Sequence, residues 1–191
     1  MTLKNSDITV GILGLQGAFH KHQKMLGRLS ANTIIIRYPE EIEKCQGIIM
    51  PGGESTTMTK LLKNMQLFEP LQQFSGPMFG TCAGAILLSS DCNDNRVEHF
   101  AKIPINTNRN AFGRQVESFI ADVQVDGFDS DFSGVFIRAP QFEEIDGTIE
   151  IVGRLKDKPV FLKYENVIVT SFHPELTDDT RIHQYFLNMI K

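Results

Sequence analysis

Short apolar runs alternate with helical segments through the first half of the chain, and this alternation constrains the fold more than any other feature. Runs rich in β-branched residues occupy 8–13, 33–37 and 47–50, and the first is nearly continuous, as in a strand buried on both faces. Apolar residues at helical spacing follow at about 18–29 and 56–65. The order predicts a three-layer α/β fold, with a mainly parallel central sheet between two layers of helices.

The second half of the chain has a different pattern. Strand-like pieces dominate residues 119–162 and predict antiparallel additions at one sheet edge, which makes the sheet mixed. VIVTSF at 167–172 is typical of a last buried strand, and a closing helix should begin near Asp178 or Asp179. With 191 residues, of which 41% are hydrophobic, we expect one well-filled core and a single domain over 1–191.

Charge and composition exclude several classes of partner. The net charge is −4 and no run of like charges occurs, so we expect neither nucleic acid nor an anionic membrane as a partner. The N-terminal segment lacks a secretory pattern, and no apolar run approaches the ~18 residues of a membrane span, which favours a cytoplasmic protein. The three cysteines, Cys45, Cys82 and Cys92, are an odd number and are expected as free thiols.

Three of the predicted strands end in unusual segments. These are PGGES at 51–55, GTCAG at 80–84 and HPE at 173–175. In open α/β sheets, ligands collect at the carboxyl ends of the strands. Glycine loops, a thiol, an imidazole and a carboxylate are therefore expected to meet at one edge of the sheet.

Cys82 stands in FGTCAGA, with a glycine two residues away on either side. The pattern is the thiol version of the G-x-S-x-G elbow, in which a nucleophile sits on a tight turn from strand to helix. A catalytic thiol needs a base to take its proton, and His173 is the predicted base. Glu175 would hold that imidazole in one tautomer if the HPE tripeptide is extended, a conformation that Pro174 favours.

Acyl transfer also needs donors for the developing oxyanion. Gly52 and Gly53 can present backbone N–H groups at a strand end, and the N–H of Ala83 is the usual second donor in an elbow. The predicted reaction is attack of the thiol on a carbonyl, followed by hydrolysis of a covalent acyl-enzyme.

Each of these residues also has a purely structural interpretation. Cys45 and Cys92 lack glycine flanks or a nearby base and are expected to be structural. The remaining histidines are expected to be surface or partly buried polar residues; they are His20, His22, His99 and His183. None of them combines with cysteines or carboxylates at the spacing of a metal site. The glycine loop, the thiol and the imidazole with its carboxylate occur together at three strand ends, and this joint occurrence favours the catalytic interpretation over the structural one.

PGGES, GTCAG and SFHPE, in this order, resemble the triad class (class I) of glutamine amidotransferases. Further segments narrow the resemblance to the glutaminase subunits of two-protein pyridoxal 5'-phosphate synthases: GLQGA at 14–18, PGGESTTM at 51–58, RNAFGRQVESF at 109–119, GVFIRAP at 134–140 and SFHPELTDD at 171–179. The resemblance extends from about residue 8 to the C-terminus.

The resemblance implies the flavodoxin-like α/β fold of class I glutamine amidotransferases. It also implies a Cys-His-Glu triad that hydrolyses L-glutamine to L-glutamate and ammonia without cofactor or metal. The triad would be Cys82, His173 and Glu175. The glutamine-binding residues implied are Gly52, Gly53, Glu54, Arg109, Ile137 and Arg138. An Arg suits the α-carboxylate of glutamine, which a guanidinium can bind through two hydrogen bonds.

The resemblance also implies a partner. Ammonia would pass to a synthase subunit for vitamin B6 biosynthesis, within a large hetero-oligomer, and Gln16 lies in a segment near the site and the partner interface. The segment DCNDNRVEHFAKIPINT departs from the family pattern. Two alternatives stay open: a glutaminase serving another synthase, such as imidazole glycerol phosphate synthase, and a non-catalytic binding domain of the same fold.

Overall fold

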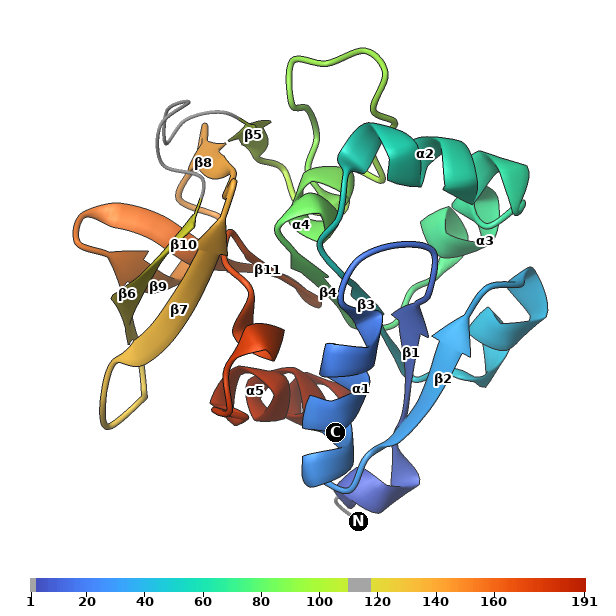
Figure 1. Ribbon diagram of the computed structural model, residues 1–191, viewed down its shortest axis with the longest axis horizontal. Helices are drawn as coiled ribbons and strands as arrows, with labels where there is room; N and C mark the ends of the chain where they lie inside the picture. Colours follow the sequence, from blue (N-terminus) through green and yellow to red (C-terminus); the bar gives the residue numbers. More distant parts are fainter. Residues whose placement is uncertain (1–2, 110–117) are drawn as a thin grey trace.

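The computed structural model describes residues 3–109 and 118–191, and its largest feature is a twisted mixed sheet (Figure 1). Among the described residues, nine strands form this sheet in the order β2-β1-β3-β4-β11-β10-β9-β6-β7. The first five strands are mutually parallel: β1 (Thr9–Leu13), β2 (Asn32–Ile36), β3 (Gly47–Met50), β4 (Met78–Thr81) and β11 (Val167–Thr170). The prediction of a mainly parallel sheet is confirmed.

Antiparallel strands extend the sheet on the side of β11. They are β10 (Lys158–Tyr164), β9 (Glu150–Leu155), β6 (Ser118–Val125) and β7 (Phe132–Ile137). Two short strands, β5 (Asn106–Asn108) and β8 (Gln141–Glu143), pair separately. The predicted antiparallel additions are confirmed, whereas most of the family-like segment 109–119 lies outside the described residues.

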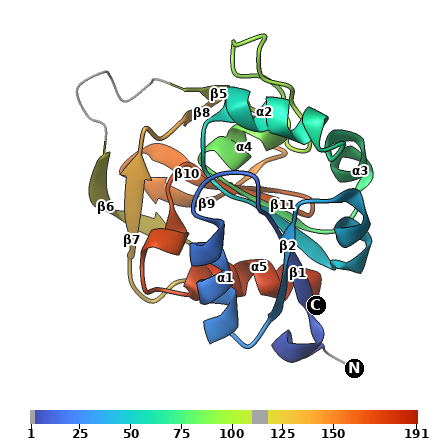
Figure 2. The ribbon, with the colours of Figure 1, turned by 45° about the vertical axis from the view of Figure 1, so that its right-hand side comes forward.

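Helices cover both faces of the parallel strands (Figures 1 and 2). One core contains residues of α2 (Ser55–Asn64), α3 (Phe68–Gln73) and α4 (Ala83–Leu88), and the other contains residues of α1 (Phe19–Arg28) and α5 (Arg181–Ile190). Short 3-10 turns occupy Asn5–Asp7, Pro39–Lys44 and Pro174–Leu176. The described helices are too short or too polar to cross a membrane.

Strand β3 explains why these runs are continuously apolar. Ile48 and Met50 belong to one core, whereas Ile49 between them belongs to the other, and all three are fully buried. Successive side chains of a strand point to opposite faces, so a strand covered on both faces needs apolar residues throughout. The prediction of a three-layer α/β fold is thereby confirmed, including the buried strands that precede the candidate site.

Candidate active site

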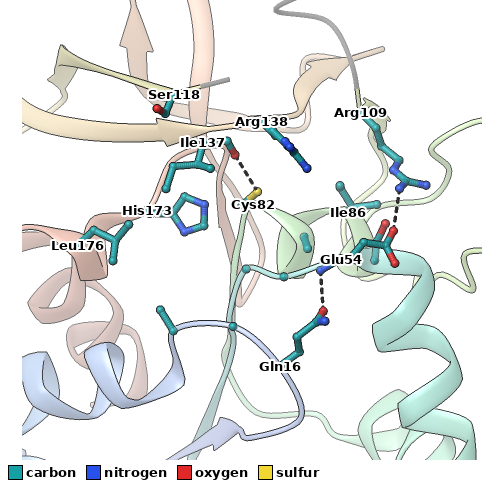
Figure 3. Close-up of a pocket in the computed structure, with 16 residues that line it drawn as sticks. Gln16, Glu54, Cys82, Ile86, Arg109, Ser118, Ile137, Arg138, His173 and Leu176 are labelled. Atoms are coloured by element: carbon teal, nitrogen blue, oxygen red, sulfur yellow. Dashed lines mark hydrogen bonds and ion pairs between the residues drawn. The ribbon is translucent and has the colours of Figure 1, made fainter. Parts of the chain in front are cut away.

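The carboxyl ends of β3, β4 and β11 lie side by side, because these strands are parallel neighbours in the sheet. The loops that follow them border a cavity of about 700 Å³. Nearly every residue that the sequence singled out lines it: Gln16, Gly52, Gly53, Glu54, Cys82, Ala83, Arg109, Ile137, Arg138 and His173 (Figure 3). Glu175 does not line the cavity and lies behind His173, fully out of solvent.

Cys82 occupies a strained turn between β4 and α4. Its backbone angles are φ 49° and ψ −105°, in a region that L-residues other than glycine rarely adopt. A Cβ on Gly84 would lie 1.8 Å from the carbonyl oxygen of Met50, and a Cβ on Gly80 would lie 2.7 Å from the carbonyl of Gly84. The flanking glycines are therefore required by backbone packing around the elbow.

The thiol of Cys82 points into the cavity beside His173 (Figure 3). Its Sγ donates to the carbonyl oxygen of Ile137 at 3.7 Å. The backbone N–H of Cys82 donates to Thr170 of β11 at 2.9 Å, which anchors the elbow to the strand that leads to His173. This hydrogen bond continues the pairing of β4 with β11 up to the two chain segments that carry the thiol and the imidazole.

His173 and Glu175 form a buried hydrogen-bonded pair. The Nδ1 of His173 lies 2.8 Å from Oε1 of Glu175. The predicted contact is present, but the predicted extended tripeptide is wrong, because Pro174–Leu176 forms a 3-10 turn. The N–H of Leu176 donates to the carbonyl of His173, and proline at the first turn position suits that geometry.

Electrostatics favour opposite charges on this pair. Burial disfavours the charged imidazole, but hydrogen bonds and charge from Cys82 and Glu175 outweigh it and raise the pKa of His173 to about 10. Burial also acts against ionised Glu175, yet the nearby His22 and His173 lower the pKa of that carboxyl below its ordinary value. The arrangement therefore stabilises an imidazolium next to the thiol and an anion behind it.

The loop after β3 is held by the loop after β1. The backbone N–H of Glu54 donates to Oε1 of Gln16 at 2.7 Å (Figure 3). A Cβ on Gly17 would lie 1.8 Å from the carbonyl oxygen of Gly52, and a Cβ on Gly52 would lie 2.4 Å from the ring of His173. These approaches leave room only for glycine and press the predicted oxyanion loop against the imidazole.

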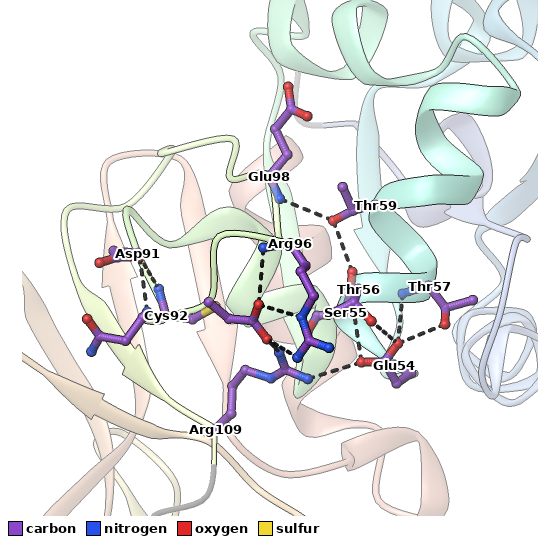
Figure 4. Close-up of polar contacts among 12 residues, drawn as sticks. Glu54, Ser55, Thr56, Thr57, Thr59, Asp91, Cys92, Arg96, Glu98 and Arg109 are labelled. Carbon is purple, nitrogen blue, oxygen red and sulfur yellow. Dashed lines mark hydrogen bonds and ion pairs between the residues drawn. The ribbon is translucent and has the colours of Figure 1, made fainter.

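Glu54 has two roles in the local structure. As the residue before α2, its carboxylate accepts hydrogen bonds from the backbone N–H groups of Thr56 and Thr57, at 3.2 and 2.7 Å (Figure 4). Burial acts to raise its pKa, but these hydrogen bonds and those of the two hydroxyls lower the pKa of Glu54 to about 2. Its other neighbour is Arg109, whose Nη2 lies 3.0 Å from Oε1.

Sequence reasoning missed three polar residues close to the site. Asp94, in the segment that departs from the family pattern, forms the second ion pair of Arg109. His22 and His183 were expected to be exposed or partly buried, but both are fully buried, so that prediction is wrong. The helical spacing of His22 with Met25 and Leu26, on the apolar face of α1, was the available signal.

The other thiols and histidines agree with their structural interpretation. Cys45 and Cys92 are buried free cysteines outside the cavity lining. Burial raises the pKa of both thiols, that of Cys45 to about 11. His20 is exposed and His99 is partly buried. Within residues 3–109 and 118–191, no three His, Cys, Asp or Glu side chains are grouped as metal ligands would be.

Comparison with known proteins identifies the family. The family model described as "SNO glutamine amidotransferase family" matches residues 12–191. The pyridoxal 5'-phosphate synthase subunit PdxT of Thermosipho africanus is 45% identical, with 95% of this chain and 98% of the relative covered. PdxT of Bacillus pumilus is 43% identical, with 96% and 95% covered.

Solved structures agree with this assignment. A crystal structure of a glutamine amidotransferase superposes with a TM-score of 0.89 at 41% identity, covering 95% of this chain and 98% of that one. The structure of PurLQS from Thermotoga maritima has a TM-score of 0.68 at 13% identity over 96% and 98%, which supports the fold alone. The chain therefore belongs to the SNO glutamine amidotransferase family.

Proposed function

We propose that this protein is the glutaminase subunit of a pyridoxal 5'-phosphate synthase. It hydrolyses L-glutamine to L-glutamate and ammonia and delivers the ammonia to a synthase subunit. The observation that carries the proposal is the arrangement of Cys82, His173 and Glu175 at adjoining strand ends, with a hydrogen bond of 2.8 Å orienting the imidazole. PdxT relatives at 45% and 43% identity, covered almost end to end, support the choice of synthase.

The first half of the reaction forms an acyl-enzyme. His173 takes the thiol proton, and Sγ of Cys82 attacks the side-chain amide carbon of glutamine. The resulting oxyanion is stabilised by the backbone N–H groups of Gly53 and Ala83, two residues that line the cavity with the thiol. His173 then gives its proton to the departing nitrogen, so ammonia leaves and a glutamyl thioester remains.

The second half of the reaction regenerates the thiol. A water molecule attacks the thioester carbonyl while His173 accepts one of its protons, and the same oxyanion donors stabilise the second tetrahedral intermediate. That intermediate collapses, the C–S bond breaks, and the proton returns to Cys82 as glutamate leaves. Throughout, Glu175 holds the imidazole in the tautomer whose Nδ1–H points away from the thiol.

Charged residues at the cavity would select free glutamine. Arg109 and Arg138 supply guanidinium groups for its α-carboxylate, and Glu54 supplies an anion for its α-ammonium group. Gly52 and Ile137 complete the binding surface without adding charge. The pocket therefore matches an amino acid with both backbone charges free, and a glutamine within a peptide would lack them.

The partner would dock at the face that carries the cavity. Gln16 lies at this face and binds the loop before α2, so it can transmit docking to the predicted oxyanion donor Gly53. We place the complex in the cytoplasm as a large hetero-oligomer of glutaminase and synthase subunits, with residues 1–191 as one domain.

The testing experiment measures glutamate release from glutamine by the purified protein, alone and with the pyridoxal 5'-phosphate synthase subunit. Activity should rise with the synthase and vanish in Cys82→Ala. The matched control is Cys92→Ala, which removes a buried thiol outside the cavity lining. Activity indifferent to this subunit would redirect the search to another synthase, such as imidazole glycerol phosphate synthase. An inactive protein under both conditions would contradict the glutaminase and favour a non-catalytic domain.

A further inference from the structure

Two buried histidines extend the chain of polar contacts behind Glu175. The Nε2 of His22 lies 3.4 Å from Oε2 of Glu175, and its Nδ1 lies 3.0 Å from Nε2 of His183. Both imidazoles are 0% exposed, and they come from α1 and α5 on the same face of the sheet. Neither residue lines the candidate active-site cavity, so glutamine would not contact them.

These contacts allow a continuous arrangement of donors and acceptors that ends at Glu175. Oε1 of Glu175 faces His173, whereas Oε2 has no hydrogen-bond partner among the described residues and lies 3.4 Å from Nε2 of His22. A neutral His22 that donates from Nε2 to the carboxylate must accept at Nδ1, and the donor available there is Nε2–H of His183. His183 then carries its lone pair on Nδ1, which has no hydrogen-bond partner among the described residues.

The surroundings keep both histidines neutral. Burial lowers the pKa of His22 against the raising effect of Glu175, with a smaller lowering effect from His173. Burial and the neighbouring His22 lower the pKa of His183 to about 3. Thr81 of β4 also faces His22, with Oγ1 3.4 Å from Nε2. A separate surface pocket next to Glu175 is bordered by charged residues, namely Lys21, Lys24 and Arg28 of α1 and Asp178. The carboxylate of Glu175 is nevertheless 0% exposed.

We propose that His22 is a positioning residue for the reaction. It would donate to the free oxygen of Glu175 and keep that carboxylate ionised and aimed at His173, while His183 fixes the tautomer of His22. Donation to a buried carboxylate favours its charged form, and an ionised Glu175 is what stabilises an imidazolium at His173. The proposal rests on the proposed glutaminase function for its kinetic consequences, whereas its consequence for Cys82 reactivity does not.

The test compares His22→Leu, which removes the donor, with His22→Gln, whose amide nitrogen can reach the Nε2 position. The first readout is the pH profile of Cys82 alkylation by iodoacetamide in the isolated protein. In His22→Leu, Glu175 should protonate at higher pH, so the acid limb should shift upward by about one unit. His22→Gln should restore the wild-type limb, and His20→Leu on the exposed face of α1 is the matched control.

The second readout is glutaminase kinetics at saturating synthase. His22→Leu should lower kcat by about tenfold to 100-fold, as loss of an outer partner that orients a histidine does elsewhere, with little change in KM. A folded His22→Leu protein with a wild-type alkylation profile would overturn the proposal. An inactive wild-type protein would overturn the glutaminase instead, since the alkylation profile still reports on His22.

Poor folding of His22→Leu would leave a second comparison. Asparagine places its amide near the Nδ1 position and cannot reach the carboxylate, whereas glutamine can. We expect His22→Asn to shift the acid limb and His22→Gln to leave it unchanged. Identical profiles in these two variants would also overturn the proposal.

Discussion

Arg109 is ion-paired with Glu54 at the edge of the candidate active-site cavity, with 3.0 Å between Nη2 and Oε1 (Figure 4). Its other terminal nitrogen contacts Asp94. Hydrogen bonds from Thr56 and Thr57 keep Glu54 ionised, and those from Arg96 lower the pKa of Asp94. The guanidinium is thus held between two carboxylates at the place where the α-carboxylate of glutamine is expected to bind.

This geometry predicts that Arg109→Ala weakens glutamine binding more than it slows the chemistry. A lost hydrogen bond to a charged group typically costs about 1.5–3 kcal/mol, so KM should rise about tenfold to 150-fold with kcat changed only a few-fold. Steady-state kinetics with the synthase subunit present would measure both constants.

Arg96→Ala is the matched control for this prediction. Arg96 also binds Asp94, but its side chain is 70% exposed and does not line the cavity. Its removal should leave KM within about twofold, as surface ion pairs contribute little. Equal effects of the two substitutions would mean that Arg109 acts by ordering the 91–96 loop and not by binding glutamine.

Gly84→Ala should severely destabilise the protein. The added methyl would lie 1.8 Å from the carbonyl oxygen of Met50, and backbone on both sides of the contact cannot move without disturbing β3 or α4. We expect the free energy of unfolding to fall by about 3 kcal/mol or more, measured by urea denaturation.

The opposite result is expected for Gly27→Ala in α1. Apart from its chain neighbours and the backbone of its own helix, no atom of the described residues lies within 4 Å of the added methyl. Alanine is favoured over glycine in a helix by about 0.5–1 kcal/mol. If Gly84→Ala were as well tolerated as Gly27→Ala, the close approach of the elbow helix to β3 would be wrong.

The buried histidines predict a loss of stability in mild acid. In the unfolded chain His183 titrates near 6.5, whereas its folded pKa is about 3, so the unfolded state binds more protons between these values. Stability from this residue is therefore present above pH 6.5 and lost as the pH falls. From pH 7 to pH 5 the contribution of His183 to that loss is about 2 kcal/mol.

Urea denaturation at pH 7 and pH 5 would measure this effect. His183→Gln should show a loss smaller by about 2 kcal/mol over that range, whatever its stability at pH 7. His173 acts in the other direction, since its raised pKa makes stability fall from about pH 6.5 toward 10. The part of this effect that lies below pH 7 is common to both proteins and cancels in their comparison. An unchanged loss in His183→Gln would contradict a neutral, buried His183.

The parallel half of the fold could be predicted from sequence because each strand is buried on both faces. Strands covered on both faces must be apolar throughout, as Ile48 and Ile49 illustrate. The ends of the neighbouring strands β4 and β11 bring Cys82 and His173 together independently of the loop conformation. Motif spacing therefore located the cavity, although the roles of its residues remain proposals.

The local conformation and the outer polar contacts could not be predicted in the same way. An extended HPE tripeptide and a 3-10 turn both bring Glu175 to His173, so the contact was predictable and the backbone was not. His22 and His183 are buried together by the packing of α1 and α5, elements far apart in sequence. The helical spacing of such polar residues can indicate that they are buried, but it does not indicate which residue of another element they contact.

Gln16 offers a final test, because it connects the loop after β1 to the predicted oxyanion loop. Its Oε1 accepts the N–H of Glu54, the residue next to Gly53, at 2.7 Å. Gln16→Ala should leave that loop unanchored and lower kcat by about tenfold or more, below the 100-fold or greater cost of losing an oxyanion donor outright. Gln16→Glu keeps an acceptor at this position and should retain most of the activity. Both variants would be assayed at synthase concentrations that saturate them, so that weaker docking does not lower the measured kcat. A wild-type kcat in Gln16→Ala would mean that the loop after β3 is ordered by its glycine contacts alone.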